Sequence, residues 1–370
     1  MKVLFISTDT KIFDPKSSVH ERFLGFSSLG EEIHVVVVRP CNYDGVYKLS
    51  SNIFVYPTSK SNTLISLIKG FFAGLKILKN DKSSKWVISV QDPFEQGWVG
   101  YMLSKIFKKP LHVQIHTDML SLFFLRNSFL DRMRVFLCSP IIRFASRIRV
   151  DALRIKDSII KKYKVKEDMI DVLQIYIDVP KMINEAGEKM INEDYILYVG
   201  RFEKEKNVES IIKAFAKIYS SYPSLKLVLL GSGSLLENYQ NLSKKLGVLD
   251  SLIVVPWTNN VGGYMKHAKA LVLSSWFEGF ALVLVEAILN GCPIITTDVG
   301  AVGGIISREY ANIFPQNDAK VLAEEIVKVL NNYEKQKEKI LLAKNDILGK
   351  IPKDLDSYTK IFKESLEKCI

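Results

Sequence analysis

The sequence predicts an α/β protein built of two doubly wound, Rossmann-like lobes that face each other across a cleft. The chain has 370 residues, of which 48% are hydrophobic and 25% charged, so it is long enough for two globular domains. Short apolar runs typical of buried parallel strands alternate with helical patterns through both halves. Several of these runs end in polar or glycine-rich loops, where such sheets bind their ligands.

The first lobe is expected over residues 1–180. Val3–Ser7 has the pattern of a buried strand, and a helix over 19–29 and a strand over 33–38 follow it, which gives the βαβ unit of a parallel sheet. A polar stretch over 181–193 is the expected linker to the second lobe. Further strands of the first lobe are predicted over 53–57, 86–90, 111–115, 149–153 and 169–177, with a helix over 64–78.

The sequence indicates a cytoplasmic protein. The apolar run at residues 1–7 is too short for a signal peptide, and no small-residue cleavage site follows it. No stretch reaches the roughly 18 to 20 apolar residues that span a bilayer. We expect free thiols rather than a metal or disulfide framework, because no metal-binding spacing joins the four cysteines, Cys41, Cys138, Cys292 and Cys369.

The net charge of +11 comes almost entirely from the first half. Residues 1–186 hold 28 Lys and Arg against 18 Asp and Glu, whereas the remainder holds 23 against 22. A basic half can serve nucleic acid, an anionic membrane or a phosphorylated acceptor. The sequence has no helix-turn-helix, RNA-binding aromatic signature or zinc spacing, so we expect no nucleic-acid partner.

Residues 122–150 contribute much of this charge. Six arginines and a single acid are interleaved there with aromatic and aliphatic residues. Such a basic amphipathic stretch can lie on the anionic inner face of the cell membrane. The alternative is a helix that faces the protein core and exposes an arginine edge. The sequence does not decide between the two.

Two strands of the first lobe end in polar residues. Asp92 precedes Pro93 after the strand over 86–90, so it can start a helix, with the acid as cap and the proline in the first turn. Alternatively, it lines the cleft near an acceptor, together with Gln91 and Glu95.

His116 and Asp118 follow the strand over 111–115. A lone histidine is more often structural than catalytic. Its place at a strand end makes a substrate contact plausible.

The second lobe is expected over residues 194–352, and two of its strands lead into candidate ligand loops. Tyr195–Gly200 reads as a buried strand, and Arg201 and Lys206 follow it directly. A strand over 225–230 runs into Gly231-Ser232-Gly233, where small residues let backbone approach a ligand. A lone pair of glycines is weak evidence, but the combination of cations and a glycine loop at neighbouring strand ends is specific.

A third strand, over 270–273, leads into a loop that contains Glu278 and then into a helix over 281–291 that carries Glu286. The free N–H groups at the start of this helix favour an anion such as a diphosphate. An ionised Glu can hold two sugar hydroxyls because it only accepts hydrogen bonds. The loop therefore suits an anion and a polyol side by side. The alternative is an ordinary β-loop-α unit with two surface acids.

These motifs resemble those of the retaining GT-B glycosyltransferases of family 4. The resemblance covers essentially the whole chain but is specific in the second half. It implies that this half binds a nucleotide-diphospho-sugar donor, such as a UDP- or GDP-sugar. The motifs that carry it are Gly200-Arg201 with Lys206-Asn207, Gly231-Ser232-Gly233, Glu278-Gly279-Phe280 with Glu286, and Asn290-Gly291-Cys292-Pro293 running to Asp298-Val299-Gly300.

The resemblance also implies roles for single residues. Arg201 and Lys206 would neutralise the donor diphosphate in place of a metal ion, Glu278 would hold the sugar, and Glu286 the ribose. His116 would reach the sugar near its reacting carbon. Val255 and Trp257 would form the base site, although Trp257 could equally be a core residue. The diphosphate would also meet the glycines of the Gly231–Gly233 loop and the helix start at Phe280, Ala281 and Leu282.

One departure from the family concerns the first loop. Members commonly carry a Gly-Gly pair there, where this chain has Asp14-Pro15-Lys16-Ser17-Ser18. We therefore expect a differently shaped acceptor side, with Ser17, Ser18, Arg22, Asp92 and Asp118 as candidate contacts. For Ser17, Ser18 and Arg22, a capped helix with a solvated arginine is the alternative.

The expected function is that of a metal-independent, retaining glycosyltransferase with no cofactor. Its acceptor would be a glycan, lipid-linked or polysaccharide, in cell-surface glycan biosynthesis. A last helix over 353–370 is expected to return to the first lobe. Two alternatives remain: an inactive GT-B subunit that serves a partner, and a GT-B nucleotide-sugar epimerase. The sequence argues against a Rossmann dehydrogenase, because no G-x-G-x-x-G follows the first strand.

Overall fold

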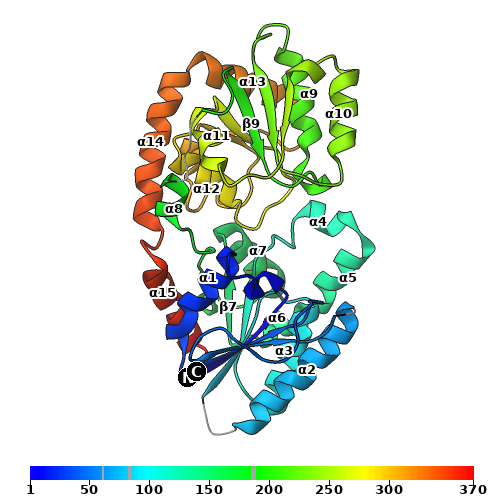
Figure 1. Cartoon of the computed structure of the whole chain (residues 1–370), viewed down its shortest axis with the longest axis vertical. Helices are drawn as coiled ribbons and strands as arrows, with labels where there is room; N and C mark the ends of the chain where they lie inside the picture. Colours follow the sequence, from blue (N-terminus) through cyan, green and yellow to red (C-terminus); the bar gives the residue numbers. More distant parts are fainter. Residues whose placement is uncertain (61, 82–84, 185–188) are drawn as a thin grey trace. The chain divides into compact units, whose positions relative to one another are not determined.

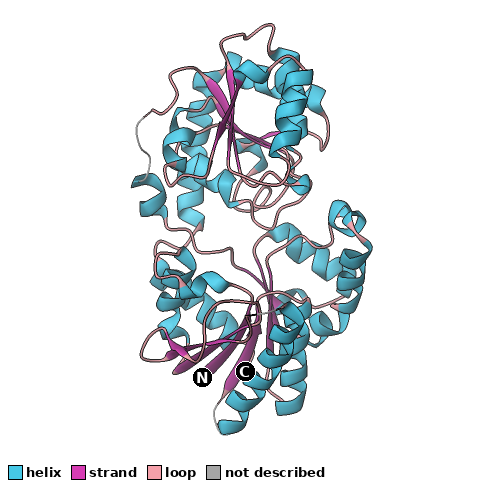
Figure 2. Ribbon diagram, turned by 45° about the vertical axis from the view of Figure 1, so that its right-hand side comes forward, coloured by secondary structure: helices cyan, strands magenta, loops and turns pink. Residues whose placement is uncertain are grey.

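The computed structural model describes residues 1–60, 62–81, 85–184 and 189–370, and the chain forms two compact units (Figure 1). The first unit comprises Met1–Tyr176 together with Pro352–Ile370, and the second comprises Ile177–Ile351. In each unit a central sheet is covered by helices (Figure 2). This is the doubly wound α/β architecture that the alternating pattern predicts.

The first unit contains an eight-stranded sheet in the order β3-β4-β2-β1-β5-β6-β7-β8. All neighbours are parallel except β3 and β4. The carboxyl ends of β1, β5, β6 and β7 therefore lie at one edge, which is where the polar loops of this unit begin. The strands are Lys2–Ser7 (β1), Glu32–Val37 (β2), Tyr47–Lys48 (β3), Ile53–Pro57 (β4), Trp86–Val90 (β5), Leu111–Ile115 (β6), Arg147–Val150 (β7) and Ile170–Val172 (β8).

Helices cover both faces of this sheet. They are η1 (Thr10–Phe13), α1 (Ser18–Gly25), η2 (Phe26–Leu29), α2 (Thr63–Asn80), α3 (Glu95–Phe107), α4 (Leu122–Asn127), α5 (Phe129–Leu137), α6 (Ser139–Phe144), α7 (Leu153–Tyr163), η3 (Glu167–Met169) and α15 (Leu355–Glu367). The helix expected over 19–29 is shorter than predicted, because its last turn tightens into η2. The strand expected over 169–177 is limited to β8.

The last helix, α15, packs against η2 and α1 of the first unit. Its Tyr358 and Phe362 are each 1% exposed and join the core beneath β1. Phe362 lies 6.1 Å from Phe5 and 5.4 Å from Phe26, measured between ring centroids. The buried aromatic side chains of α15 thus attach this helix to the first unit.

The second unit contains a six-stranded, all-parallel sheet in the order β11-β10-β9-β12-β13-β14. Its strands are Tyr195–Val199 (β9), Lys226–Leu230 (β10), Leu252–Val255 (β11), Ala270–Leu273 (β12), Ile294–Thr296 (β13) and Asn312–Ile313 (β14). Its helices are α8 (Val179–Asn184), η4 (Lys204–Lys206), α9 (Val208–Ile218), α10 (Leu236–Lys245), η5 (Leu249–Ser251), α11 (Val261–His267), α12 (Leu282–Leu289), η6 (Arg308–Tyr310), α13 (Ala319–Asn331) and α14 (Tyr333–Lys350).

The boundary between the units falls between Tyr176 and Ile177, a few residues before the expected linker over 181–193. Part of that stretch is helical, because α8 runs to Asn184 and packs on α12. Residues 185–188 of the expected linker lie outside the described part of the chain.

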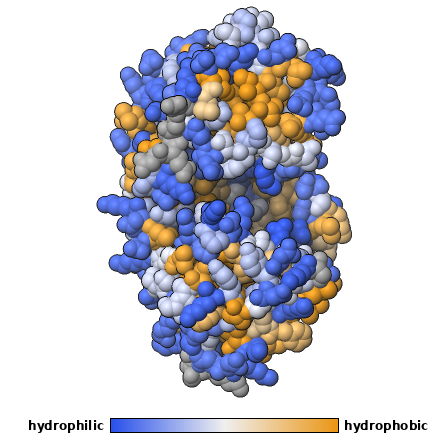
Figure 3. All heavy atoms as spheres, viewed as in Figure 1, coloured by the Kyte–Doolittle hydropathy of each residue, from blue (hydrophilic) through white to orange (hydrophobic). Residues whose placement is uncertain are grey.

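The arginine-rich stretch over 122–150 folds as three short helices and β7, and α5 leaves an apolar face uncovered. Phe129, Leu130, Met133, Phe136 and Leu137 recur at helical spacing and are 37% to 74% exposed. Figure 3 shows apolar side chains on the right-hand margin of the first unit, where α5 and α2 lie. No helix in the described ranges is both long and apolar enough to cross a bilayer.

Candidate functional site

In the second unit, the predicted donor residues lie in loops that leave one edge of the sheet. Arg201 and Lys206 follow β9, the Gly231–Gly233 loop follows β10, and Glu278 follows β12. Because β9 pairs with both β10 and β12, these three loops are neighbours. The topology therefore brings together residues that are up to 77 positions apart in the chain.

The glycines of this edge let two loops approach each other. Phe202 donates its N–H to the carbonyl of Ser232 at 2.8 Å. A Cβ on Gly233 would lie 2.5 Å from the backbone N and O of Phe202, and one on Gly231 would lie 2.0 Å from the carbonyl oxygen of Gly200. Gly231 also has a φ of +143°. Glycine is thus required here for close contact between the loops, whether or not a ligand also approaches.

Lys206 and Glu278 form an ion pair, with Nζ and Oε1 2.7 Å apart. Both side chains are largely buried, with 15% and 13% of their surfaces exposed. Ser275 donates its hydroxyl to the same Glu278 oxygen at 2.7 Å. The backbones are joined as well, because Trp276 donates its N–H to the carbonyl of Glu205 at 2.9 Å. A cation and a carboxylate are thereby fixed side by side.

Arg201 is much more exposed, at 72% of its side-chain surface. Its guanidinium contacts Glu205 at 2.9 Å, and its carbonyl accepts a hydrogen bond from the hydroxyl of Tyr198 at 2.8 Å. The backbone of Arg201 is therefore anchored, while its side chain extends from the sheet edge. An exposed surface pair of this kind contributes little stability, so the guanidinium can exchange partners readily.

The helix after Glu278 begins at Leu282, one residue later than predicted. Ala281 precedes it in the left-handed conformation, with a φ of +61°. Phe280 and Ala281 are buried, at 5% and 7% exposure, and the carbonyl of Phe280 accepts a 2.7 Å hydrogen bond from Ala301. Within the described ranges no side chain caps α12, so its first N–H groups can receive an anion. Glu286 lies on the second turn and is half-buried.

The proposed base-site residues are Val255, the last residue of β11, and Trp257, two residues beyond it. The carbonyl of Val255 accepts a hydrogen bond from Gly231 N–H at 2.9 Å, which ties it to the glycine loop. Trp257 is 66% exposed, so the alternative that it is a core residue is wrong. An exposed indole at a ligand edge offers a surface on which a planar base can stack.

In the first unit, a cavity of about 580 Å³ lies at the carboxyl ends of β1, β5 and β6. Both Asp92 and His116 line it. Its other polar walls come from Thr8, Asp9, Thr10, Lys11, Arg39, Gln91, Gln96 and Thr117. A smaller cavity of about 170 Å³ is lined by His116, Arg22 and Arg149, among others. His116 therefore lies between two cavities.

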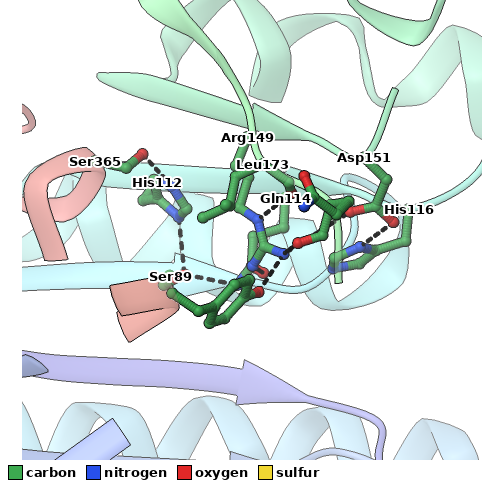
Figure 4. A network of polar contacts seen from close by, with 10 residues as sticks. Ser89, His112, Gln114, His116, Arg149, Asp151, Leu173 and Ser365 are labelled. Atoms are coloured by element: carbon green, nitrogen blue, oxygen red, sulfur yellow. Dashed lines mark hydrogen bonds and ion pairs between the residues drawn. The ribbon is translucent and has the colours of Figure 1, made fainter. Parts of the chain in front are cut away.

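The Nδ1 atom of His116 lies 2.8 Å from Oδ2 of Asp151, which is 3% exposed (Figure 4). The two residues directly follow Ile115 and Val150, which are paired across β6 and β7. Sequence reasoning missed Asp151. Its place immediately after the strand that neighbours β6 was the available signal.

Burial raises the pKa of the Asp92 carboxyl to about 6. Oδ1 of Asp92 accepts the backbone N–H of Phe94 at 2.8 Å, and the amide of Gln96 donates to its other oxygen. Asp92 precedes the N-cap of α3, which is Phe94, so it supports the turn before the helix and also lines the cavity. Glu95 pairs instead with Arg134 at 2.7 Å, and both are exposed.

The remaining acceptor-side candidates have different roles in the structure. Ser17 caps α1, because its hydroxyl accepts the N–H of His20 at 3.1 Å, and Ser18 begins that helix. The capped-helix interpretation is therefore correct for Ser17. Arg22 is not the solvated residue of that alternative, since its side chain is 26% exposed and lines the smaller cavity. Asp118 accepts backbone N–H groups of Leu120 and Ser121, and burial raises its pKa.

Comparison with known proteins places this geometry in context. Residues 182–345 match the family described as glycosyl transferases group 1. A Campylobacter jejuni N-acetylgalactosamine-N,N'-diacetylbacillosaminyl-diphospho-undecaprenol 4-alpha-N-acetylgalactosaminyltransferase is 28% identical over 179 residues, which is 48% of each chain. The Staphylococcus aureus capsular polysaccharide biosynthesis glycosyltransferase CapM is 24% identical over 301 residues, 75% of each chain. The chain thus spans about half the length of the Campylobacter protein.

Among solved structures, the chain is similar to Anabaena HepE, whose crystal structure is a complex with UDP. The TM-score is 0.74 at 15% sequence identity, and the match covers 99% of this chain and 100% of HepE. At this identity the likeness concerns the fold, which is GT-B.

Proposed function

We propose that this chain, whose residues 182–345 match the glycosyl transferases group 1 family and whose fold is GT-B, transfers a sugar from a nucleotide-diphospho-sugar to a glycan acceptor in cell-surface glycan biosynthesis. The observation that carries the proposal is the buried Lys206–Glu278 pair beside the uncapped start of α12. A cation, free N–H groups and a carboxylate at one sheet edge match a sugar diphosphate, whose phosphates need positive charge and whose hydroxyls need acceptors.

Donor binding would exchange the partners of this pair. The ammonium of Lys206 would move from Glu278 to the diphosphate, and the guanidinium of Arg201 would leave Glu205 to bind the same phosphates as a fork. Glu278 would then be free to accept hydrogen bonds from the sugar. The two cations would stabilise the charge that builds on the leaving diphosphate, without a metal ion.

We propose a retaining, front-face reaction, as in the family that the motifs resemble. The bond between the anomeric carbon and the phosphate oxygen breaks, and the acceptor oxygen bonds to that carbon from the same side. The acceptor's hydroxyl proton passes to the leaving phosphate oxygen. The cavity of the first unit around His116 and Asp92 would hold hydroxyl groups of the substrates.

The experiment is a panel of UDP-, GDP-, ADP- and dTDP-sugars in EDTA, read first as thermal stabilisation and then as transfer to glycan acceptors. One donor should stabilise the wild type, and the Arg201→Ala/Lys206→Ala variant should lose that stabilisation. Lys213→Ala is the matched control, because Lys213 lies on the adjacent helix α9 in an exposed pair with Glu209. No stabilisation by any donor, with or without added magnesium or manganese, would contradict the proposal and favour an inactive subunit.

The products distinguish the remaining alternatives. A transferase forms glycoside only when acceptor is present, whereas an epimerase converts the donor alone. NMR of the new anomeric centre reports whether configuration is retained. Activity that appears only after a divalent metal is added would overturn metal independence.

We also propose that α5 rests on an anionic membrane, where a lipid-linked acceptor would be found. Its exposed apolar face includes Phe129, at 67%, and Phe136, at 74%, and Arg126 and Arg132 are exposed beside it. Apolar side chains can enter the headgroup region while arginines bind anionic lipids.

Vesicle sedimentation tests this. Wild type should bind phosphatidylglycerol vesicles more strongly than phosphatidylcholine vesicles, and Phe129→Ser/Phe136→Ser should weaken that binding. Leu341→Ser/Leu342→Ser on α14 is the control, since these residues are each 61% exposed in the second unit. Equal loss in both variants, or no preference for anionic lipid, would count against a membrane role for α5.

A further inference from the structure

A buried polar network surrounds Arg149 in the first unit (Figure 4). Arg149 is 3% exposed, and its guanidinium donates to the carbonyls of Leu173 and Gln174, the side-chain oxygen of Gln114 and the hydroxyl of Tyr358. All four acceptors are neutral. The nearest negative charge is the carboxylate of Asp151, with Oδ1 3.8 Å from the guanidinium. Asp151 therefore supplies the counter-charge of Arg149.

Asp151 itself has an unusual set of contacts. Its Oδ2 contacts Nδ1 of His116 at 2.8 Å, whereas its buried Oδ1 accepts no hydrogen bond within the described residues. Burying a carboxylate is costly unless hydrogen bonds compensate it. Apart from the charge of Arg149, this carboxylate has one directed partner, and that partner lines both cavities of the first unit.

The contact with Asp151 determines which nitrogen of the His116 ring carries the proton. A carboxylate can only accept a hydrogen bond, so Nδ1 of His116 must carry the proton. The guanidinium of Arg149 lies 3.8 Å from the other oxygen of Asp151, so this carboxylate also has a cationic neighbour. The neutral ring then has a bare Nε2, which has no protein partner among the described contacts, and the side chain is 32% exposed.

We propose that Asp151 is a positioning residue for His116, which it holds with Nδ1 protonated and Nε2 free to accept a hydrogen bond from a substrate hydroxyl. The identity of that substrate rests on the proposed function, but the state of the ring does not. Arg149 lies 3.8 Å from the other oxygen of Asp151 and is itself held by Tyr358 of α15, so this helix contributes to the surroundings of a strand-end histidine.

The first test observes the ring directly and requires no activity. The chain has five histidines, so ¹⁵N-histidine labelling gives a small set of signals, and His116→Gln assigns the one in question. Two-bond correlation spectra at neutral pH should show Nε2 as the bare nitrogen of His116. His112 is a reference, because burial lowers its pKa to about 3 and keeps it neutral. A bare Nδ1 in the wild type would overturn the proposal.

Asp151→Asn is the decisive variant. The side-chain oxygen of Asn should turn toward Arg149, so that its NH₂ group donates to Nδ1 and the proton of His116 moves to Nε2. Asp171→Asn is the matched control, since Asp171 is also paired with an arginine, Arg147, at 2.6 Å, but does not contact His116. The control should lose stability and leave the His116 tautomer unchanged. An unchanged tautomer in Asp151→Asn would contradict the proposal.

A kinetic cycle adds a second readout. Asp151→Asn should lower the transfer rate by about 10²-fold, because misorienting a substrate-contacting group by about 1 Å costs that much. In a His116→Ala background the same change should have no further effect, since it acts through the ring. If the two substitutions lowered the transfer rate additively, Asp151 would not act through the His116 ring, and the proposal would be contradicted. Absence of transfer in the wild type would defeat the proposed function but leave the tautomer result to decide this one.

Discussion

The two units place their polar residues at the same edge of a parallel sheet but hold them differently. In the second unit, Lys206 and Glu278 lie in loops whose backbones are hydrogen-bonded to each other, and their side chains form a largely buried ion pair. In the first unit, the ring of His116 contacts the side chain of Asp151, which lies beside a buried Arg149. The first arrangement joins two loops through backbone and side chain, and the second is a buried network of side chains.

The loop pair of the second unit and the buried network of the first unit should respond differently to mutation. Removing Lys206 from the loops of the second unit should reduce binding and transfer more than folding, because the loop backbones keep their contacts and Ser275 still donates to Glu278. Removing a member of the buried network should affect stability and function together, since a buried partner is left unpaired. Four predictions test that contrast, from the largest expected effect to the smallest.

The largest effect is expected at Lys206. Lys206→Ala should lower the transfer rate by about 10²- to 10³-fold, the typical loss when one group that stabilises transition-state charge is removed. Steady-state kinetics with the donor found in the panel measure this. Lys213→Ala should remain within twofold of the wild type, and an equal loss there would mean that general charge, not position, matters.

Gly233→Ala should separate the two loops of the second unit. Its new Cβ would lie 2.5 Å from backbone atoms of Phe202, which no rotamer change can relieve. We expect a loss of about 1–3 kcal/mol in stability, as for other overpacked sites, together with weaker donor binding. Denaturant unfolding measures the stability. Gly349→Ala is the control on α14, where a Cβ meets no atom within 4 Å, and it should stabilise the helix slightly.

Asp92 should make the first unit sensitive to pH. Burial raises its pKa to about 6 in the folded protein, above the value of 3.8 that is usual for Asp. Between these values the folded state binds a proton that the unfolded chain has released, so stability falls as pH rises from about 4 to 6. Asp92→Asn cannot ionise and should flatten this part of the curve. Urea unfolding between pH 4 and 8 measures it, and an unchanged slope in the variant would contradict the assignment.

The smallest effect is expected at Tyr358. Tyr358→Phe removes the hydroxyl that accepts from Arg149 at 2.7 Å, and it should cost about 1.5 kcal/mol, the low end for a hydrogen bond to a charged group, because the same nitrogen still donates to the carbonyl of Gln174. Tyr222→Phe is the control, because its hydroxyl bonds Asn331 at an exposed site. A shift in melting temperature in the first variant but not the second is the expected result.

Much of this molecule could be predicted from local patterns. Buried strands are apolar runs of five or so residues, and glycine and charged residues directly after them mark the loops, so β9, β10 and β12 were identified with their motifs. The helix start near Ala281 was predicted to within one residue. These features depend on residues close together in the chain. Hydrophobic periodicity and helix start signals are read over the same short distances.

The sequence by itself determined the two α/β units and the residues at the ends of their strands, because each of these is encoded within a few turns or one strand. Only the tertiary structure decided that Trp257 is exposed, that Arg22 lines a cavity, and that Asp151 holds His116. The contact of Arg149 with Tyr358 joins residues 209 positions apart. Such contacts depend on which strands become neighbours and where the last helix packs, and no local pattern records that.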